Sequence, residues 1–148
     1  SRALRWLSKV SLEGFADYYP HQVSGGMRQR AALARAFIAE PRALLLDEPF
    51  GALDALTRMT LQDALRDLIR EQAPTVLLVT HDVDEAIFLA DHILVFSPRP
   101  ARVLRTFSLG RGERSHDLSG FEGMRSEILR LLGIGAGQVE PSPTSQGA

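Results

Sequence analysis

The chain alternates between short apolar runs and longer stretches in which apolar residues recur with helical spacing. The apolar runs lie at residues 43–46, 75–80 and 92–97. Because continuous apolar runs of this length are typical of strands buried on both faces, we predict buried strands at the first two and a further strand at the third. Residues 102–109 mix apolar and polar positions, which favours a more exposed, antiparallel strand.

Five stretches have the periodicity of amphipathic helices. The clearest is 57–70, where Leu61, Leu65, Leu68 and Ile69 fall on one face of the predicted helix. The other helices are predicted at residues 2–12, 27–39, 83–90 and 121–132. Helices therefore alternate with strands along most of the chain.

Composition narrows the class of protein. The chain has 148 residues, the size of one ordinary domain, with 45% hydrophobic residues and a formal net charge of -1. This balance gives no overall reason to expect a nucleic acid partner, and no aromatic residues interleave with Arg28, Arg30 and Arg35 to form a basic binding surface. Since the sequence has no cysteine, it offers neither a disulfide framework nor a thiolate metal site.

The apolar pattern does not predict a membrane-spanning segment. No apolar run approaches the roughly 20 residues that a bilayer requires, and no secretory signal pattern begins the sequence. The helix predicted at 121–132 carries Glu122 and Glu127 together with Arg125 and Arg130 on its polar face. This mixture favours packing on the protein body over a membrane-surface helix. We expect a soluble protein that reaches a membrane only through a partner.

Two neighbouring features carry candidate chemistry. Ser24, Gly25 and Gly26 stand directly ahead of a predicted helix, where free N–H groups and absent side chains favour an anion such as phosphate. Asp47 and Glu48 follow the first predicted strand, at the edge where ligands bind in open α/β sheets. Each feature alone has an ordinary explanation, a turn with a helix cap or a strand that ends in polar residues. In combination they indicate nucleotide chemistry with a metal ion.

The order of four motifs is more specific. They resemble motifs of ABC-type ATPases: the signature motif in VSGGMRQR, Walker B in LLLDEP, the D-loop in GALD and the switch-histidine loop in VTHD. The resemblance implies an α/β fold in which a P-loop NTPase-type parallel sheet is flanked by helices. Two further segments are similar to the importer branch for nitrate, sulfonates and taurine. They are YPHQ, which precedes the signature, and DEPFGALDALTR, which spans Walker B and the D-loop.

The resemblance also implies a domain layout. Residues 1–132 would form part of an ABC ATPase domain, while residues 133–148, rich in glycine, proline and serine, are predicted to be a disordered tail. Within this domain, residues 1–40 would form the end of a helical subdomain with the signature. Residues 41–109 would form a core with Walker B, the D-loop and the switch histidine, and residues 110–132 a C-terminal loop and helix.

Three aromatic residues near the start of the chain have two interpretations. Trp6, Phe15 and Tyr18 are expected to pack in the core or within the helical subdomain. The alternative is that they contact a membrane subunit, which the resemblance would supply as a partner. The packing interpretation is the simpler one.

The resemblance assigns a role to each residue near the strand edge. Asp47 would bind Mg²⁺, a hard cation that prefers carboxylate and water oxygens, and Glu48 would orient or deprotonate the attacking water. His81 would contact the γ-phosphate of ATP, where an imidazole can donate or accept hydrogen bonds. Outside its setting at a strand edge, His81 would be interpreted as a core or cap histidine. Asp54 would lie in the loop that joins two ATPase subunits.

The signature residues would act on the nucleotide of a partner subunit. Ser24, Gly25 and Gly26 would bind the γ-phosphate of ATP held by the opposite subunit, so that dimerisation becomes part of the mechanism. Met27 belongs to the same nucleotide-binding set and stands where many family members have glutamine. Methionine also occurs there in the importer branch, so it does not imply an inactive site. Val23 replaces the more usual leucine.

One motif of nucleotide binding is missing from the sequence. The only lysine is Lys9, and no GxxxxGK[ST] segment is present. The chain begins with Ser1 and its first methionine is Met27, so we expect a fragment whose P-loop lies upstream. We also expect the 148 residues alone to be unable to bind ATP tightly or to hydrolyse it.

The function implied by the resemblance is that of the ATP-hydrolysing subunit of an importer, a homodimer that uses ATP and Mg²⁺ at the cytoplasmic face of a membrane. Its other partners would be transmembrane permease subunits and, indirectly, a periplasmic or surface solute-binding protein. The solute would be a small anion such as an aliphatic sulfonate, taurine or nitrate.

Two alternatives belong to other classes of protein. One is a soluble ABC ATPase that acts on DNA or ribosomes, although the sequence has neither a long coiled-coil insertion nor a second ATPase unit. The other is a truncated half-protein that dimerises or regulates without hydrolysing ATP.

Overall fold

The computed structural model describes residues 1–51, 53–110 and 112–134, and the order of helices and strands confirms the prediction. Two short 3₁₀ turns, Glu13–Phe15 and Pro20–Gln22, precede the second helix. The main elements are α1 (Arg2–Lys9), α2 (Gly25–Ile38), β1 (Ala43–Asp47), α3 (Ala55–Gln72), β2 (Thr75–Val79), α4 (Val83–Leu89), β3 (His92–Phe96), β4 (Val103–Ser108) and α5 (Glu122–Leu131). Most of the predicted tail, from residue 135 onward, lies outside the described residues.

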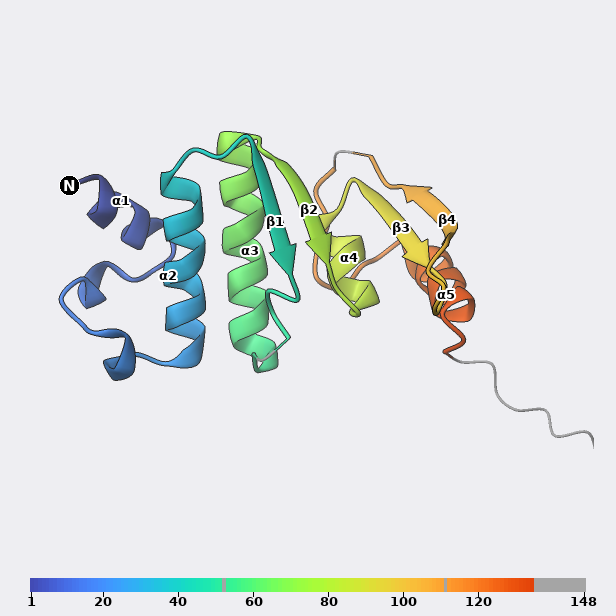
Figure 1. Cartoon of the computed structure of the whole chain (residues 1–148), viewed down its shortest axis with the longest axis horizontal. Coiled ribbons are helices and arrows are strands. Elements are labelled where there is room, and N and C mark those ends of the chain that lie inside the picture. The colour runs from blue at the N-terminus through green and yellow to red at the C-terminus, as the bar shows by residue number, and fades with distance from the viewer. Residues whose placement is uncertain (52, 111, 135–148) are drawn as a thin grey trace, which may run out of the picture.

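The described strands form one parallel and one antiparallel pair. β1 and β2 run parallel, with Ala43 opposite Thr75 and Asp47 opposite Val79. β3 and β4 pair antiparallel, which confirms the direction predicted for residues 102–109. The parallel pair needs a crossover connection, and α3 provides it. The result is an α/β arrangement in which helices flank a parallel strand pair (Figure 1).

Three helices begin at the end of the molecule toward which the parallel strands point. In Figure 1 the arrowheads of β1 and β2 point toward the same end as the starts of α2 and α3. The N-cap residues are Ser24 for α2, Asp54 for α3 and Asp82 for α4, and each side chain accepts a backbone N–H of the first turn. Strand ends and helix starts therefore meet at one edge, which holds the candidate site.

The interior is organised as two hydrophobic clusters. The first joins α1, α2, α3 and β1, and Phe37, Leu61 and Leu65 are almost fully buried within it. Trp6 is 7% exposed and stacks on Phe37 with ring centroids 6.2 Å apart, so the packing predicted for Trp6 is confirmed. The second cluster joins α4, β3, β4 and α5 around Ile87, Phe88, Ile93, Val95, Phe107, Leu118 and Ile128.

The last helix packs on the protein body, as its pattern predicts. Ile128 is buried in the second cluster, and Met124 and Leu131 pack against it. Arg125 on α5 pairs with Asp84 on α4, with Nη2 and Oδ2 3.1 Å apart. Among the described helices, none combines the length and the apolar character that crossing a bilayer would require.

The prediction that the parallel strands are buried on both faces is wrong for the described chain. Leu44 and Val76 face the first hydrophobic cluster, but the alternate residues Leu45, Leu77 and Val79 are 75%, 59% and 52% exposed. Successive side chains of a strand point to opposite faces, and the described helices cover only one face of this pair. The apolar runs thus mark a second face that the described residues leave open.

The packing predicted for Phe15 and Tyr18 is also wrong. These side chains are 41% and 53% exposed, and their rings meet edge to face with centroids 5.2 Å apart. They lie in the turns between α1 and α2, where Leu12 and Val10 supply the buried contacts instead. The pair is therefore a local surface contact and not part of the core.

Candidate functional site

The ends of the parallel strands bring Glu48 and His81 into contact. Glu48 directly follows β1, and His81 lies two residues after the end of β2. His81 Nδ1 lies 2.8 Å from Glu48 Oε2. The backbone N–H of Glu48 donates to the carbonyl oxygen of Val79 at 2.9 Å, which extends the strand pairing to this point. A carboxylate and an imidazole separated by 33 positions in the sequence therefore form one pair at the strand edge.

This pair is electrostatically coupled and open to solvent. The hydrogen bond with Glu48, and then the negative charge of Glu48, raise the pKa of His81 above its ordinary value. The His81 side chain is 80% exposed and that of Glu48 41%, so the attraction contributes little to folding stability. What the arrangement offers is a carboxylate with its oxygen held toward an imidazole, a combination suited to holding or moving a proton.

Glu48 adopts an unusual backbone conformation. Its φ is +45°, in the left-handed region that residues with a Cβ rarely occupy. Four other non-glycine residues of the described chain share this feature, so it is not unique to the site. At Glu48 the left-handed turn directly follows the last residue of β1 and redirects the chain into the loop before α3. Such backbone strain is concentrated at functional positions in proteins.

Asp47 ends β1 with an exposed side chain, opposite Val79 of β2. Within the described ranges, no three histidine or acidic side chains converge to form a ready metal site. Mg²⁺ is commonly bound by one or two carboxylates, with water and substrate phosphate oxygens completing the shell. The exposed carboxylate of Asp47 fits that donor set, but Asp47 alone would not hold the ion.

The start of α2 combines an open glycine with a crowded one. Ser24 Oγ accepts the backbone N–H of Met27 at 3.2 Å, so it acts as the helix cap that its ordinary interpretation predicts. A Cβ on Gly25 would meet only the end of the Arg28 side chain, at 3.8 Å. A Cβ on Gly26 would instead lie 2.5 Å from Thr57 Cγ2 of α3. Packing within the chain therefore explains Gly26 and leaves Gly25 unexplained.

Asp54 and Met27 lie close to this helix start but have different surroundings. Asp54 caps α3 by accepting the backbone N–H of Thr57 at 3.0 Å, and hydrogen bonds from the side chain and then the backbone of Thr57 lower its pKa. Its carboxylate is exposed at the first turn. Met27 is partly buried and packs against the first hydrophobic cluster. The structure thus turns Met27 toward the core and leaves Asp54 at the surface.

A buried acidic residue four positions after His81 was missed by the sequence reasoning. Glu85 of α4 is only 4% exposed, and burial raises the pKa of its carboxyl group, while a hydrogen bond with the Thr80 side chain acts in the opposite direction. Arg58 of α3 pairs with Asp82 nearby. The available signal was an acidic residue on the apolar face of a predicted helix, because Glu85 shares that face with Phe88 and Leu89.

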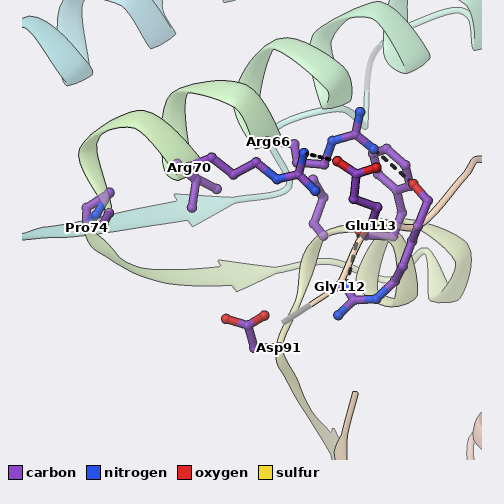
Figure 2. A pocket seen from close by; sticks show the side chains of 11 residues that line it. Arg66, Arg70, Pro74, Asp91, Gly112 and Glu113 are labelled. Carbon is purple, nitrogen blue, oxygen red and sulfur yellow. Dashed lines mark hydrogen bonds and ion pairs between the residues drawn. The ribbon is translucent and has the colours of Figure 1, made fainter. Parts of the chain in front are cut away.

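A cavity of about 540 Å³ lies away from these residues, between the ends of α3 and α4 and residues 112–114 (Figure 2). Arg114 is 8% exposed and donates to the carbonyl oxygens of Ile87 and Ala90 at the end of α4. Burial lowers the pKa of its guanidinium. Arg70 is paired with Glu113 at 3.1 Å. These arginines are occupied in holding the loop on the helices, and none of the predicted site residues lines the cavity.

Comparison with known proteins shows which class of protein this chain resembles. Residues 1–51 match the family model described as ABC transporter. Beyond this segment, the chain resembles ATP-binding proteins of ABC importers over most of its length. It is 50% identical over 112 residues to the taurine import ATP-binding protein TauB of Yersinia pestis, covering 76% of this chain and 44% of that protein.

Relatives named for sulfonate import extend further along the chain. The aliphatic sulfonates import ATP-binding protein SsuB 2 of Rhodococcus jostii is 48% identical over 134 residues, which cover 90% of this chain and 54% of that protein. SsuB of Bacillus cereus is 41% identical over 131 residues, with 88% and 52% covered. The chain therefore spans about half the length of the curated relatives it matches.

Solved structures confirm the α/β fold class. A dimeric bacterial ABC transporter cassette is 39% identical with a TM-score of 0.60, covering 75% of this chain and 47% of that chain. A dimeric post-hydrolysis state of an ATP-binding cassette bound to ADP and Pi is 38% identical, again with a TM-score of 0.60 and the same coverage. The chain shares the architecture of these cassettes over three quarters of its length.

Proposed function

We propose that this chain is part of the ATP-binding subunit of an ABC importer and carries the hydrolytic edge of its ATPase site. The observation that carries the proposal is the contact between Glu48 and His81 at the ends of two parallel strands. The chain that holds this contact matches the ABC transporter family model over residues 1–51. The relatives support the importer branch, since their names assign them to taurine and aliphatic sulfonate import. The alternative of a soluble ATPase acting on DNA or ribosomes has no such support.

Three residues at the strand edge share the chemistry in this proposal. Glu48 accepts a proton from, or orients, the water that attacks the terminal phosphate, and His81 holds Glu48 in place while presenting its own ring toward the same region. Asp47 supplies a carboxylate oxygen to Mg²⁺, which would neutralise phosphate charge when bound. The exposure of all three side chains leaves them accessible to a nucleotide held from outside the described residues.

The start of α2 serves a nucleotide of the opposite subunit in this proposal. Gly25 supports it, because nothing within 4 Å except the Arg28 side chain explains why this position lacks a Cβ. Backbone N–H groups at a helix start can approach a phosphate closely where no side chain intervenes. Ser24, Gly26 and Met27 complete the segment, and Asp54 lies beside it at the start of α3.

The solute and the remaining partners are proposed from the names of the relatives and from the resemblance of the motifs to the importer branch. We propose a small sulfonate anion, with taurine as the first candidate and nitrate as a weaker one, imported through permease subunits that hold this ATPase at the cytoplasmic face of the membrane. A homodimer agrees with the dimeric cassettes of similar fold. A solute-binding protein outside the membrane would choose the solute, so that the ATPase site itself need not recognise it.

Replacing the proposed base tests this function directly. In the intact ATP-binding subunit, Glu48→Gln should lower ATP turnover by roughly a hundredfold or more, because the amide keeps the shape of the side chain but cannot accept the proton. ATP binding should persist, and the variant should accumulate as an ATP-bound dimer. Turnover within a few fold of the unmodified subunit would show that Glu48 is the wrong carboxylate.

A further inference from the structure

One arginine connects the two loops that flank the candidate site. Arg58 lies in the first turn of α3, and its Nη1 donates to Asp82 Oδ2 at 3.1 Å, while its Nη2 donates to the carbonyl oxygen of Leu53 at 3.2 Å. Leu53 belongs to the loop between Glu48 and α3, and Asp82 directly follows His81. A single planar guanidinium therefore bonds to both segments at once.

Asp82, which pairs with Arg58, also forms hydrogen bonds with the residues on either side of His81. Its Oδ1 accepts the backbone N–H groups of Asp84 and Glu85, at 2.9 and 3.1 Å, and so caps α4. Its own backbone N–H donates to Thr80 Oγ1 at 3.0 Å. Because both neighbours of His81 are fixed by these bonds, the direction in which His81 leaves the strand depends on how Asp82 is held.

The loop at Leu53, the second segment that Arg58 bonds to, lies against the start of α2. Leu53 directly precedes Asp54, the N-cap of α3, and its Cδ2 lies 3.8 Å from the place a Cβ on Gly26 would occupy. The charged pair is about one third exposed on each side, with values of 34% for Arg58 and 31% for Asp82. Partial burial makes such a charge-assisted pair more directional than an exposed ion pair.

We propose that Arg58 is a positioning residue that couples the loop at Leu53 and Asp54 to the orientation of His81. The inference rests on the proposed function, in which His81 and Glu48 act on the nucleotide and Asp54 lies toward the partner subunit. When the loop moves against the partner, the guanidinium transmits the displacement to Asp82 and so to His81. The role requires arginine, since the compact ammonium of lysine does not present two donor nitrogens, held in one plane, to two separate acceptors.

Arg58→Gln in the intact subunit tests the proposal, with Arg70→Gln as the matched control. Arg70 lies on the same helix and forms an exposed pair with Glu113, remote from His81. Arg58→Gln should lower kcat roughly tenfold, in line with the cost of a small misplacement of catalytic groups, while the KM for ATP changes by less than about twofold. Arg58→Lys should recover only part of kcat, and Arg70→Gln should leave both constants unchanged.

A double-mutant cycle distinguishes coupling from a general loss of structure. Asp82→Asn keeps an oxygen that can cap α4 but loses the charge that faces Arg58. If the two residues act as one unit, Arg58→Gln combined with Asp82→Asn should reduce kcat no further than the more damaging single change. Additive losses would overturn the coupling. So would a loss of kcat that disappears when activity is expressed per folded molecule, measured by thermal unfolding and circular dichroism.

Comparing Glu48→Gln with Arg58→Gln distinguishes failure of the positioning role of Arg58 from failure of the proposed function. Should Glu48→Gln retain turnover, the assignment of the hydrolytic edge itself would fail. Should Glu48→Gln abolish turnover while Arg58→Gln preserves it, the edge would stand and the positioning role of Arg58 would be refuted. If Arg58→Gln does not fold, Asp82→Asn tests the same proposal, because it removes the charge of the other member of the Arg58–Asp82 pair.

Discussion

At the scale of single residues, backbone geometry fixes the Glu48–His81 pair more firmly than charge does. Both side chains are well exposed, so their attraction is weakened by water. The left-handed φ of Glu48 and the bond from its N–H to Val79 hold the base of the side chain at the strand edge instead. The pair can therefore open when a nucleotide competes for either group, while the backbone keeps both in reach.

Titration of His81 tests the pair directly. The hydrogen bond and charge of Glu48 raise the pKa of His81, so their stabilising contribution is present below the ordinary histidine value and is lost as pH rises through the raised value. Glu48→Gln removes the charge and should shift the titration midpoint of His81 downward. Nuclear magnetic resonance of ¹⁵N-labelled histidine in the nucleotide-free subunit would measure this, with the other histidine signals as internal controls. A midpoint that does not move would show that the pair is not formed in solution.

Sequence reasoning located the residues at the strand ends but not the groups that orient them. Asp47, Glu48 and His81 could be placed because a strand end is readable from an apolar run and its polar successor. Arg58 lies on α3 and Asp82, 24 positions later, is the N-cap of α4, so their contact depends on how α3 and α4 pack. No periodicity within one segment reports such a contact between segments.

At the scale of elements, the starts of α2 and α3 approach closely, and this contact gives the two glycines different roles. Gly26→Ala would place a Cβ against Thr57 and should destabilise the intact subunit by about 1–3 kcal/mol, the usual cost of overpacking. Gly25→Ala has room for its methyl group and a helical position that favours alanine, so stability should stay equal or rise by a few tenths of a kcal/mol.

The activity of the same two variants completes the comparison. If the start of α2 meets a phosphate of the partner subunit, Gly25→Ala should lose turnover despite its intact fold, because the methyl group blocks close backbone approach. Thermal unfolding and ATP turnover per folded molecule would be measured side by side. A Gly25→Ala variant with full turnover would reduce the segment to an ordinary helix start, with Ser24 as its cap.

The strands show a different limit of prediction at this scale. An apolar run indicates that both faces of a strand are suited to burial, but it does not identify the elements that cover them. In β1 and β2 the helices described cover the face of Leu44 and Val76, and Leu45 and Leu77 remain exposed. The element types and their order were therefore predictable, while the extent of burial depended on which other parts of the domain are present.

At the scale of the whole molecule, the proposed ATPase site is shared between subunits. In our proposal each nucleotide lies between the phosphate-binding lysine loop of one subunit, which this sequence does not contain, and the Ser24–Gly26 segment of the other. Gly25→Asp would set a carboxylate against the phosphate and should block dimerisation and turnover. Each intact subunit should still bind ATP in its own pocket, because Gly25 does not belong to that pocket.

Mixing two inactive variants distinguishes a shared site from a site within one subunit. One variant is Gly25→Asp, and the other has its phosphate-binding lysine replaced. In a heterodimer of the two, one composite site loses both elements and the other keeps both, so a shared site predicts that up to half of the normal turnover returns. A site built within one subunit predicts none, because each subunit lacks one of its own elements. Turnover of the mixture, with heterodimer formation measured separately, decides between them.

A heterodimer without ATP turnover would have one further explanation, which is that both sites must be competent before either one hydrolyses ATP. Counting bound nucleotide resolves it. A shared site predicts that the heterodimer, formed in the presence of ATP, retains one ATP at the intact composite site even without turnover. Gly25→Asp alone should bind ATP without forming a dimer, and the lysine variant alone should retain no ATP. If the heterodimer forms but traps no nucleotide, the start of α2 does not contact the partner's phosphate, and Gly25 must be explained by some other contact.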